Sequence, residues 1–123
     1  MTVKELYQTI GGDYDAALKI MMMEPIVSKM IVKLLDDKSF GRIRQGGETM
    51  DATELFEGAH ALKGVAASLG LTRLSEQAGV ICDEFRPGRE RTRTDEEVRT
   101  LLAEIEALYN RTLEGIRAFA GRA

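Results

Sequence analysis

Apolar residues recur at intervals of three and four positions along almost the whole chain, which is the spacing of one face of an α-helix. Strand-like alternation of Val, Ile and Thr is nearly absent, and only Pro25 and Pro87 interrupt the pattern. The pattern predicts an all-α fold, an antiparallel four-helix bundle with additional short helices at its N-terminal end. We expect residues 1–123 to form a single domain, because a chain of this length suits one core.

Capping residues mark the first two expected helices. Thr2 and Glu5 have the spacing of a capping box, and the helix that they open is predicted to end at Gly11-Gly12. Asp13 is expected to cap the helix that follows. These signals predict two short helices before the main bundle.

A third helix is expected after a break near Met23-Glu24, because Pro25 suits the first turn of a helix. The three consecutive methionines at residues 21–23 cannot all face one direction, so we expect at least one of them at the surface. For the group we favour core positions over a methionine-rich binding patch. A loop is predicted at Gln45-Gly46-Gly47-Glu48, after a short helix over residues 39–43. The apolar stripe of the third helix is expected to comprise Ile26, Met30, Ile31, Leu34 and Leu35.

Three longer helices are predicted in the second half of the chain. The first begins at the cap residue Asp51 and ends at Gly70, a suitable glycine for a helix C-terminus. The second runs from Thr72 to the turn Arg86-Pro87-Gly88. The last and longest follows Thr94, which opens a further capping box.

The amino-acid composition excludes several kinds of site and partner. The chain has 17 basic and 20 acidic side chains, a net charge of −3, so we expect no nucleic-acid binding. One cysteine cannot form an internal disulfide, and one histidine with it leaves a zinc site short of ligands, so we expect neither a metal nor a cofactor on this chain. The N-terminus lacks a signal-peptide core and no apolar run is long enough to span a bilayer, so we expect a cytoplasmic protein that does not enter the membrane. The arginines of the loop Arg86–Arg93 are interpreted as solvated.

The only histidine, His60, falls on the outward face of its predicted helix. At about 100° per residue it lies about 160° from Leu62, which is at the centre of the core stripe. Gly64 and Ala67 are its neighbours along the same face, and Lys63 lies on the adjacent row. A glycine inside a helix costs about 1 kcal/mol relative to alanine, so Gly64 indicates a need for open space beside the imidazole. The core stripe is predicted to consist of Leu55, Ala59, Leu62, Ala66 and Leu69.

An exposed imidazole beside a flexible cation suits the transfer of a phosphoryl group. A histidine ring nitrogen is nucleophilic near neutral pH, and Lys63 can offset the negative charge that the phosphoryl group brings. No acidic residue has the spacing of a nucleophilic triad, and no nucleotide-binding loop is present, so kinase activity of the chain's own is not expected.

The segment Ala59-His60-Ala61-Leu62-Lys63-Gly64-Val65-Ala66-Ala67-Ser68-Leu69-Gly70 resembles the signature of histidine-containing phosphotransfer (HPt) domains. The resemblance rests on the pattern H-x-L-K-G, followed by a glycine six residues later, in an all-helical chain of this length. It implies that His60 accepts a phosphoryl group from an aspartate of one receiver domain and passes it to another in a two-component phosphorelay. It also implies that Lys63 stabilises the phosphoryl group, and that Gly64 and Ala67 lie where the receiver docks.

The same resemblance implies response-regulator receiver domains and a hybrid sensor kinase as partners, a magnesium ion on the receiver rather than on this chain, and a monomer. Many family members place Gln or Glu on the next helix to hold the second imidazole nitrogen. Counting without gaps puts Cys82 at that position, where its hydrogen bond would be weak. Gln77, Asp83 and Glu84 stay open as alternatives.

Two other classes of function remain open from the sequence. A non-transferring helical adaptor would bind or sequester receiver domains tightly without accepting phosphate. A dimeric metal- or ligand-binding bundle would use His60 across a two-fold axis, and protein that contains no metal and loses no stability on chelation would exclude the metal version. The phosphoryl carrier is the favoured hypothesis.

Overall fold

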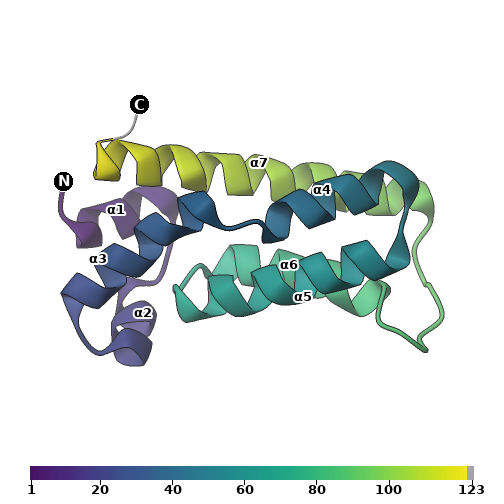
Figure 1. Cartoon of the computed structure of the whole chain (residues 1–123), viewed down its shortest axis with the longest axis horizontal. Helices are drawn as coiled ribbons and strands as arrows, with labels where there is room; N and C mark the ends of the chain where they lie inside the picture. Colours follow the sequence, from purple (N-terminus) through teal and green to yellow (C-terminus); the bar gives the residue numbers. More distant parts are fainter. Residues whose placement is uncertain (122–123) are drawn as a thin grey trace.

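Helices form most of the computed structural model, which describes residues 1–121. The elements are α1 (Val3–Ile10), α2 (Tyr14–Met21), α3 (Glu24–Lys33), the short 3-10 helix η1 (Leu34–Asp36), α4 (Ser39–Thr49), α5 (Ala52–Ser68), α6 (Thr72–Glu84) and α7 (Asp95–Ala120). In Figure 1, α7 runs along the whole molecule, α4, α5 and α6 lie beside one half of it, and α1, α2 and α3 gather at the other end. The described residues contain no strand, so the expected all-α bundle with short N-terminal helices is confirmed.

The capping residues begin the helices as predicted. Thr2 and Thr94 each accept a bond from the third residue of their helix, and the glutamate at that position reaches back to the backbone N–H of the threonine. Asp13 and Asp51 cap α2 and α5 with one side-chain bond each. Gly11 follows α1 in the left-handed conformation, with φ +71°. Local hydrogen-bonding groups alone therefore place these helix ends.

The segment Gln45-Gly46-Gly47-Glu48 is helical, and its prediction as a loop is wrong. α4 continues through both glycines. A Cβ on Gly46 would lie 3.0 Å from Cβ of Glu54, and one on Gly47 would lie 2.8 Å from a methyl group of Leu102. The two glycines thus let α4 approach α5 and α7 closely, and this tertiary contact outweighs the low helix propensity of glycine.

The methionines at residues 21–23 lie largely at the surface. Met22 takes a left-handed conformation at the end of α2, with φ +71°, and Met23 is the extended residue before α3. Met22 is 81% exposed and Met23 is 59% exposed, whereas Met21 is half-buried. The expected break in the chain and the exposure of at least one methionine are confirmed. The preference for core positions is wrong, because the break puts two of the three methionines in the exposed connection between α2 and α3.

The apolar stripe predicted for α3 is wrong in part. Ile31 and Leu34 are buried as expected, but Val27 shares the core with them. Ile26 and Met30 are 41% and 36% exposed. Because the chain breaks before α3, the residues of this helix that face the core are not those that a continuation of α2 would place there.

The N-terminal helices are tied to the C-terminal end of α5. The hydroxyl of Tyr7, which is buried, donates to the backbone oxygen of Leu69 at 2.6 Å, and the backbone nitrogen of Asp13 donates to the oxygen of Gly70 at 2.8 Å. Gly70 has φ +69°, and a Cβ there would collide with the backbone oxygen of Asp13. The glycine predicted to end α5 therefore also provides the close approach on which the N-terminal helices sit.

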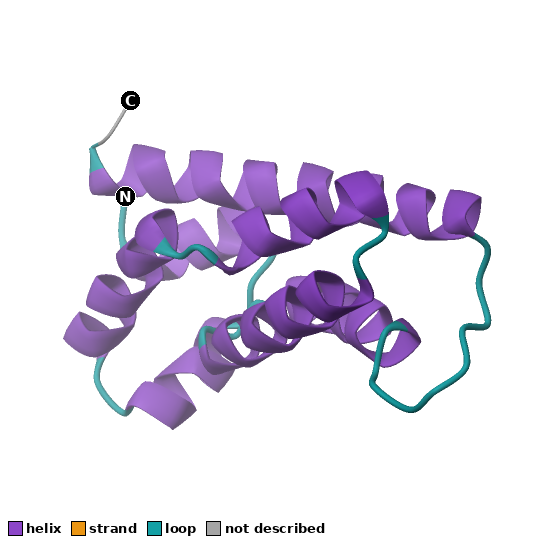
Figure 2. Ribbon diagram, turned by 45° about the vertical axis from the view of Figure 1, so that its right-hand side comes forward, coloured by secondary structure: helices purple, strands orange, loops and turns teal. Residues whose placement is uncertain are grey.

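A buried carboxylate holds the long connection between α6 and α7, which Figure 2 shows as the large loop at one end of the bundle. Glu84 is buried and accepts bonds from the backbone nitrogens of Thr92 at 2.9 Å and Arg93 at 2.8 Å. It also accepts from the Thr92 hydroxyl at 2.8 Å, and the guanidinium groups of Arg91 and Arg93 lie 3.5 and 3.7 Å away. The arginines of this loop are at the surface, as expected, but pair with acceptors of the same region.

The hydrogen bonds to Glu84 make its contribution depend on pH. Burial on its own raises the pKa of the Glu84 carboxyl, but the donors of Arg93 and Thr92 outweigh it and hold the pKa below its ordinary value of 4.5. A carboxyl with a lowered pKa in the folded state stabilises the fold fully above its unfolded value. That contribution is lost as the pH falls through the folded value.

We predict that Glu84→Gln lowers the free energy of unfolding by about 2 kcal/mol at pH 7, because an amide leaves some of the buried donors without an acceptor. The difference from the unsubstituted protein should shrink as the pH falls below 4.5. Urea denaturation at several pH values measures both effects. Glu90→Gln, an exposed change in the same loop, is the control and should leave stability unchanged. A pH-independent difference would contradict the prediction.

Candidate functional site

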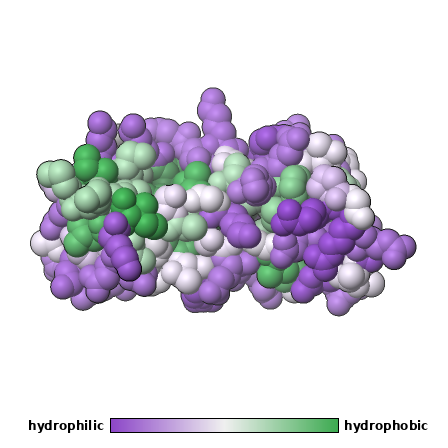
Figure 3. Space-filling view, turned by 90° about the horizontal axis from the view of Figure 1, so that it is seen from below, coloured by the Kyte–Doolittle hydropathy of each residue, from purple (hydrophilic) through white to green (hydrophobic). Residues whose placement is uncertain are grey.

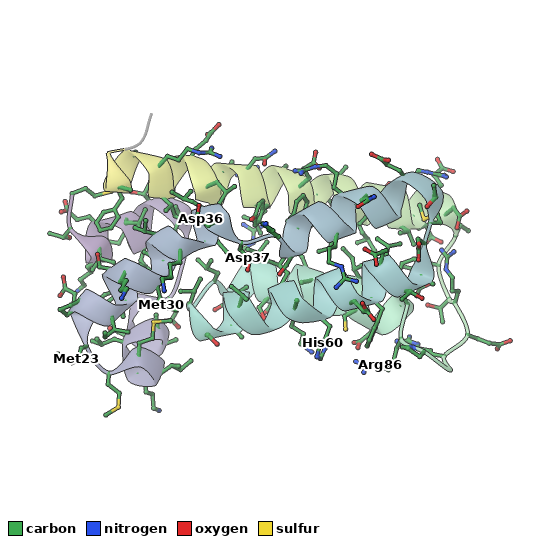
Figure 4. The ribbon with its side chains drawn as sticks, in the orientation of Figure 1. Met23, Met30, Asp36, Asp37, His60 and Arg86 are labelled. Carbon is green, nitrogen blue, oxygen red and sulfur yellow. The ribbon has the colours of Figure 1, made fainter. Side chains whose placement is uncertain are left out.

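His60 lies on the outward face of α5, as the helical spacing predicts. Figure 4 shows it on the open edge of the molecule, away from α4 and α7. The imidazole is exposed, and so are Lys63, Gly64 and Ala67. The predicted core stripe of Leu55, Ala59, Leu62, Ala66 and Leu69 is buried. One face of α5 is therefore used for the core, and the other presents the imidazole with its predicted neighbours.

Two neighbours contact the imidazole ring. Phe56, one turn earlier on α5, stacks on it with a centroid distance of 5.7 Å and an interplanar angle of 16°. Sγ of Cys82, from α6, lies 3.9 Å from Nδ1. Among the described residues no hydrogen-bond partner meets Nε2, so this nitrogen is the one available to a reactant.

Cys82 occupies the position that ungapped counting gave it. It is buried, and burial raises the pKa of its thiol, so the group stays protonated at neutral pH. A thiol is a weak donor and a weak acceptor, so it favours one ring orientation less strongly than a carboxamide would. Nδ1–H donating to this sulfur is the tautomer that leaves a lone pair on Nε2.

The other candidates for this role are placed elsewhere. Gln77 lines a small surface pocket with Glu104 and Arg111, on the side of α6 that faces α7. Asp83 accepts a bond from the Arg86 side chain at 2.8 Å, and Glu84 is occupied by the α6–α7 loop. Of the four residues left open by the sequence, Cys82 is the one that the structure brings to the imidazole.

Lys63 follows the surface of α6. Its Cε would lie 3.6 Å from a Cβ on Gly79, which is ordinary contact distance, so the lysine stem packs on α6 at this glycine. The hydroxyl of Ser75 donates to the backbone oxygen of Lys63 at 3.1 Å and joins the two helices at this level. The ammonium is close enough to Cys82 and Asp83 to lower the pKa of each of them by its charge, although it is not the main influence on either. A cation is thus available beside the imidazole.

Gly64 leaves an open space next to His60. No heavy atom would lie within 4 Å of a Cβ at this position, in contrast to Gly58 of the same helix, where a Cβ would lie 3.0 Å from Cβ of Arg42 and from the backbone nitrogen of Ile43. Gly58 is needed for the contact between α4 and α5. Gly64 makes no such contact, and the helix surface beside the imidazole is open at this position.

A groove of about 490 Å³ begins at Gly64 and runs between α3 and α5. It continues into an apolar area that Figure 3 shows on the same side of the molecule, over α2 and α3. We call this area the methionine patch; it consists of the exposed residues Ile20, Met22, Met23, Ile26 and Met30. Large exposed apolar areas are uncommon on a monomer and often mark a place where another protein binds.

Sequence reasoning missed two residues near the imidazole. Phe56 is at the i−4 position from His60, and extending the helical wheel to the outward face would have found it. Arg86 lies beyond the end of α6, with its guanidinium carbon 5.7 Å from the centroid of the Phe56 ring. Its proximity depends on how α5 and α6 pair, and no local pattern contains that information.

Comparison with known proteins gives one match. The model of the family described as Hpt domain matches residues 24–112, which include α3 to α6 and most of α7. No curated protein and no solved structure gives a significant match. In the part of the chain that the structure describes, no helix is both long enough and apolar enough to cross a membrane.

We predict opposite effects of the same substitution at the two glycines of α5. Gly64→Ala should raise the free energy of unfolding by about 1 kcal/mol, because it improves helix propensity at an open position. Gly58→Ala should lower it by about 1 kcal/mol or more, because the new methyl group meets α4. Urea denaturation with circular dichroism measures both, and destabilisation by Gly64→Ala would show that this position is not open.

Proposed function

This chain belongs to the Hpt domain family, and on that premise we propose that His60 carries a phosphoryl group on Nε2 between aspartates of receiver domains in a two-component phosphorelay. Family membership itself implies histidine phosphotransfer in a phosphorelay, with receiver domains as partners. The setting of His60 supports the choice of this residue: Nδ1 is held against Cys82, and the helix face beside the ring is open at Gly64.

In the proposed step, the lone pair on Nε2 of His60 attacks the phosphorus of a receiver's aspartyl phosphate. The P–N bond forms as the P–O bond breaks, and the bonding electrons leave with the aspartate as its carboxylate. The imidazole keeps its proton on Nδ1 beside Cys82, and Lys63 offsets part of the charge that the ring receives. The reverse step passes the group to the aspartate of a second receiver, so neither direction consumes a nucleotide.

This division of labour leaves the chain as a carrier rather than an enzyme. The receiver brings the aspartate and a magnesium ion, and a hybrid sensor kinase is the proposed source of the phosphoryl group. A monomer in the cytoplasm suits the role, because His60 must be reachable by each partner in turn.

Docking is proposed on the face that contains Gly64, Ala67 and the methionine patch. The groove at Gly64 is continuous with the patch, so one receiver surface can cover both while its aspartate reaches His60. Exposed lysines border this face at Lys29 and Lys33, and they complement an acidic partner. Methionine side chains adapt to differently shaped surfaces, which suits a carrier that must bind a donor and an acceptor with one face.

The alternative, a non-transferring adaptor, would need the same docking face but not the chemistry of His60. The open position at Gly64 favours the carrier, because tight binding alone would be served better by a side chain that fills the groove. Transfer of label separates the two.

We predict that His60→Gln abolishes acid-labile phosphorylation by a phosphorylated receiver while leaving the helical content and the unfolding transition unchanged. The reason is that His60 is exposed, so its loss removes the nucleophile without opening the core. Radiolabelled phosphate transfer from a panel of receiver domains measures the effect. Label retained by the variant would disprove the assignment, and tight receiver binding without transfer to the unsubstituted chain would favour the adaptor.

We predict that the double substitution Met22→Ser and Met23→Ser raises the receiver concentration needed for half-maximal transfer about tenfold, because burial of two apolar side chains on docking is lost. Labelling of the same variant by phosphoramidate should be unchanged. This small donor transfers its phosphoryl group to the imidazole with loss of ammonia and needs no docking surface. Equal receiver dependence of the variant and the unsubstituted chain would place docking elsewhere.

A further inference from the structure

Phe56 links the imidazole to a second cation. Its ring lies almost parallel to that of His60, and the guanidinium of Arg86 lies 5.7 Å from its centroid. Arg86 also follows Cys82 by four residues, and Cys82 contacts the imidazole from α6. The contact with Phe56 and the position just beyond the end of α6 therefore put Arg86 on the side of the molecule that presents the imidazole, and Figure 4 shows the two side chains on the same edge.

In the resting protein, Asp83 holds the guanidinium of Arg86. Nη2 donates to Oδ1 at 2.8 Å, and the two side chains are 48% and 51% exposed. The hydrogen bond from Arg86, helped by the charges of Lys63 and Arg89, holds the pKa of the Asp83 carboxyl below its ordinary value. Asp83 is therefore an anion at neutral pH, and it lies within the influence of the cations around the imidazole. An ion pair this exposed exchanges partners readily.

We propose that Arg86 is a second binding cation for the phosphoryl group on His60, and that Asp83 holds it until that group arrives. The proposal rests on the proposed function, because it concerns the phosphorylated state of His60. When the phosphoryl group is bound, the guanidinium leaves the carboxylate and binds phosphoryl oxygens. When the group departs, Asp83 takes the guanidinium back.

The chemistry of the three groups favours this exchange. A phosphoryl group presents close to two negative charges and three acceptor oxygens, whereas a carboxylate presents one charge and two oxygens. Arginine binds phosphate through two parallel N–H donors, a geometry that the ammonium of Lys63 cannot provide. Phe56 keeps an aromatic face against the guanidinium and so limits how far it moves between its two partners.

The exchange gives Asp83 a role in setting the phosphoryl equilibrium. It competes with the phosphoryl group for Arg86, so it favours the unphosphorylated carrier. Arg86 has the opposite effect. The two effects are coupled, because each operates through the same guanidinium.

The test is the equilibrium constant for phosphoryl exchange with one receiver, measured from the distribution of radiolabel at fixed ionic strength. We expect Arg86→Gln to shift the constant roughly threefold away from the phosphorylated carrier, and Asp83→Asn to shift it roughly threefold towards it. In the Arg86→Gln background, Asp83→Asn should have little effect. Arg89→Gln is the matched control: it removes the same charge from the same loop, but Arg89 bonds the backbone oxygen of Asp83 instead, and the constant should not change.

A second measurement follows the guanidinium itself. The Nε–Hε resonance of Arg86 should move on phosphorylation in the unsubstituted protein and should already be displaced in unphosphorylated Asp83→Asn. An unmoved resonance, or an unchanged constant for Arg86→Gln, would overturn the proposal. An equal effect of Asp83→Asn in both backgrounds would also overturn it, because simple repulsion would then explain the result. If the unsubstituted chain accepts no label, both the proposed function and the role of Arg86 are wrong. If every variant accepts label with the same equilibrium constant, only the role of Arg86 is wrong.

Discussion

The position of α5 between α4 and α6 is the constraint on which the candidate site depends. On one side, Gly58 lets α4 approach so closely that a Cβ there would lie 3.0 Å from atoms of Arg42 and Ile43. On the other side, Cys82 of α6 meets the imidazole, and the stem of the neighbouring lysine packs on α6 at Gly79. At its C-terminal end, Gly70 joins α5 to the N-terminal helices. α5 is thus packed on two sides and at its end, and its remaining face presents the imidazole to solvent.

Features that depend on one or two turns of a single helix could be predicted from the sequence. The cap at Thr94 needs only the hydroxyl and the glutamate three residues later. The outward direction of His60 follows from the apolar stripe of the same helix. Gly46 and Gly47 show the limit of this reasoning, because their local propensity is for a loop. They lie in a helix that packs closely against α5 and α7, and that packing is set by segments far away in the sequence.

The parts of the site that sequence reasoning missed lie between helices. Phe56 could be placed beside His60 from its spacing, but its stacking with a guanidinium needs the end of α6 to lie there as well. The preference for core positions at residues 21–23 was wrong for Met22, which follows α2 and is exposed. The left-handed backbone at Met22 ends α2, so α3 does not continue the helical register of α2. An apolar area is therefore left exposed beside the groove at Gly64.

The two neighbouring carboxylates at the end of α6, Asp83 and Glu84, differ in burial. The carboxylate of Glu84 is buried under several donors, and its bonds hold the α6–α7 loop in one arrangement. Asp83, the next residue before it, is half exposed with its arginine. Since an exposed ion pair shifts an equilibrium by no more than about fivefold, cations in this setting favour a bound phosphoryl group without trapping it. A desolvated cation at the same distance would bind the group far more strongly and oppose its return to an aspartate. The same α6 terminus therefore combines a buried anchor, Glu84, with an exposed ion pair, Asp83 and Arg86, and the second suits the proposed reversible transfer through His60.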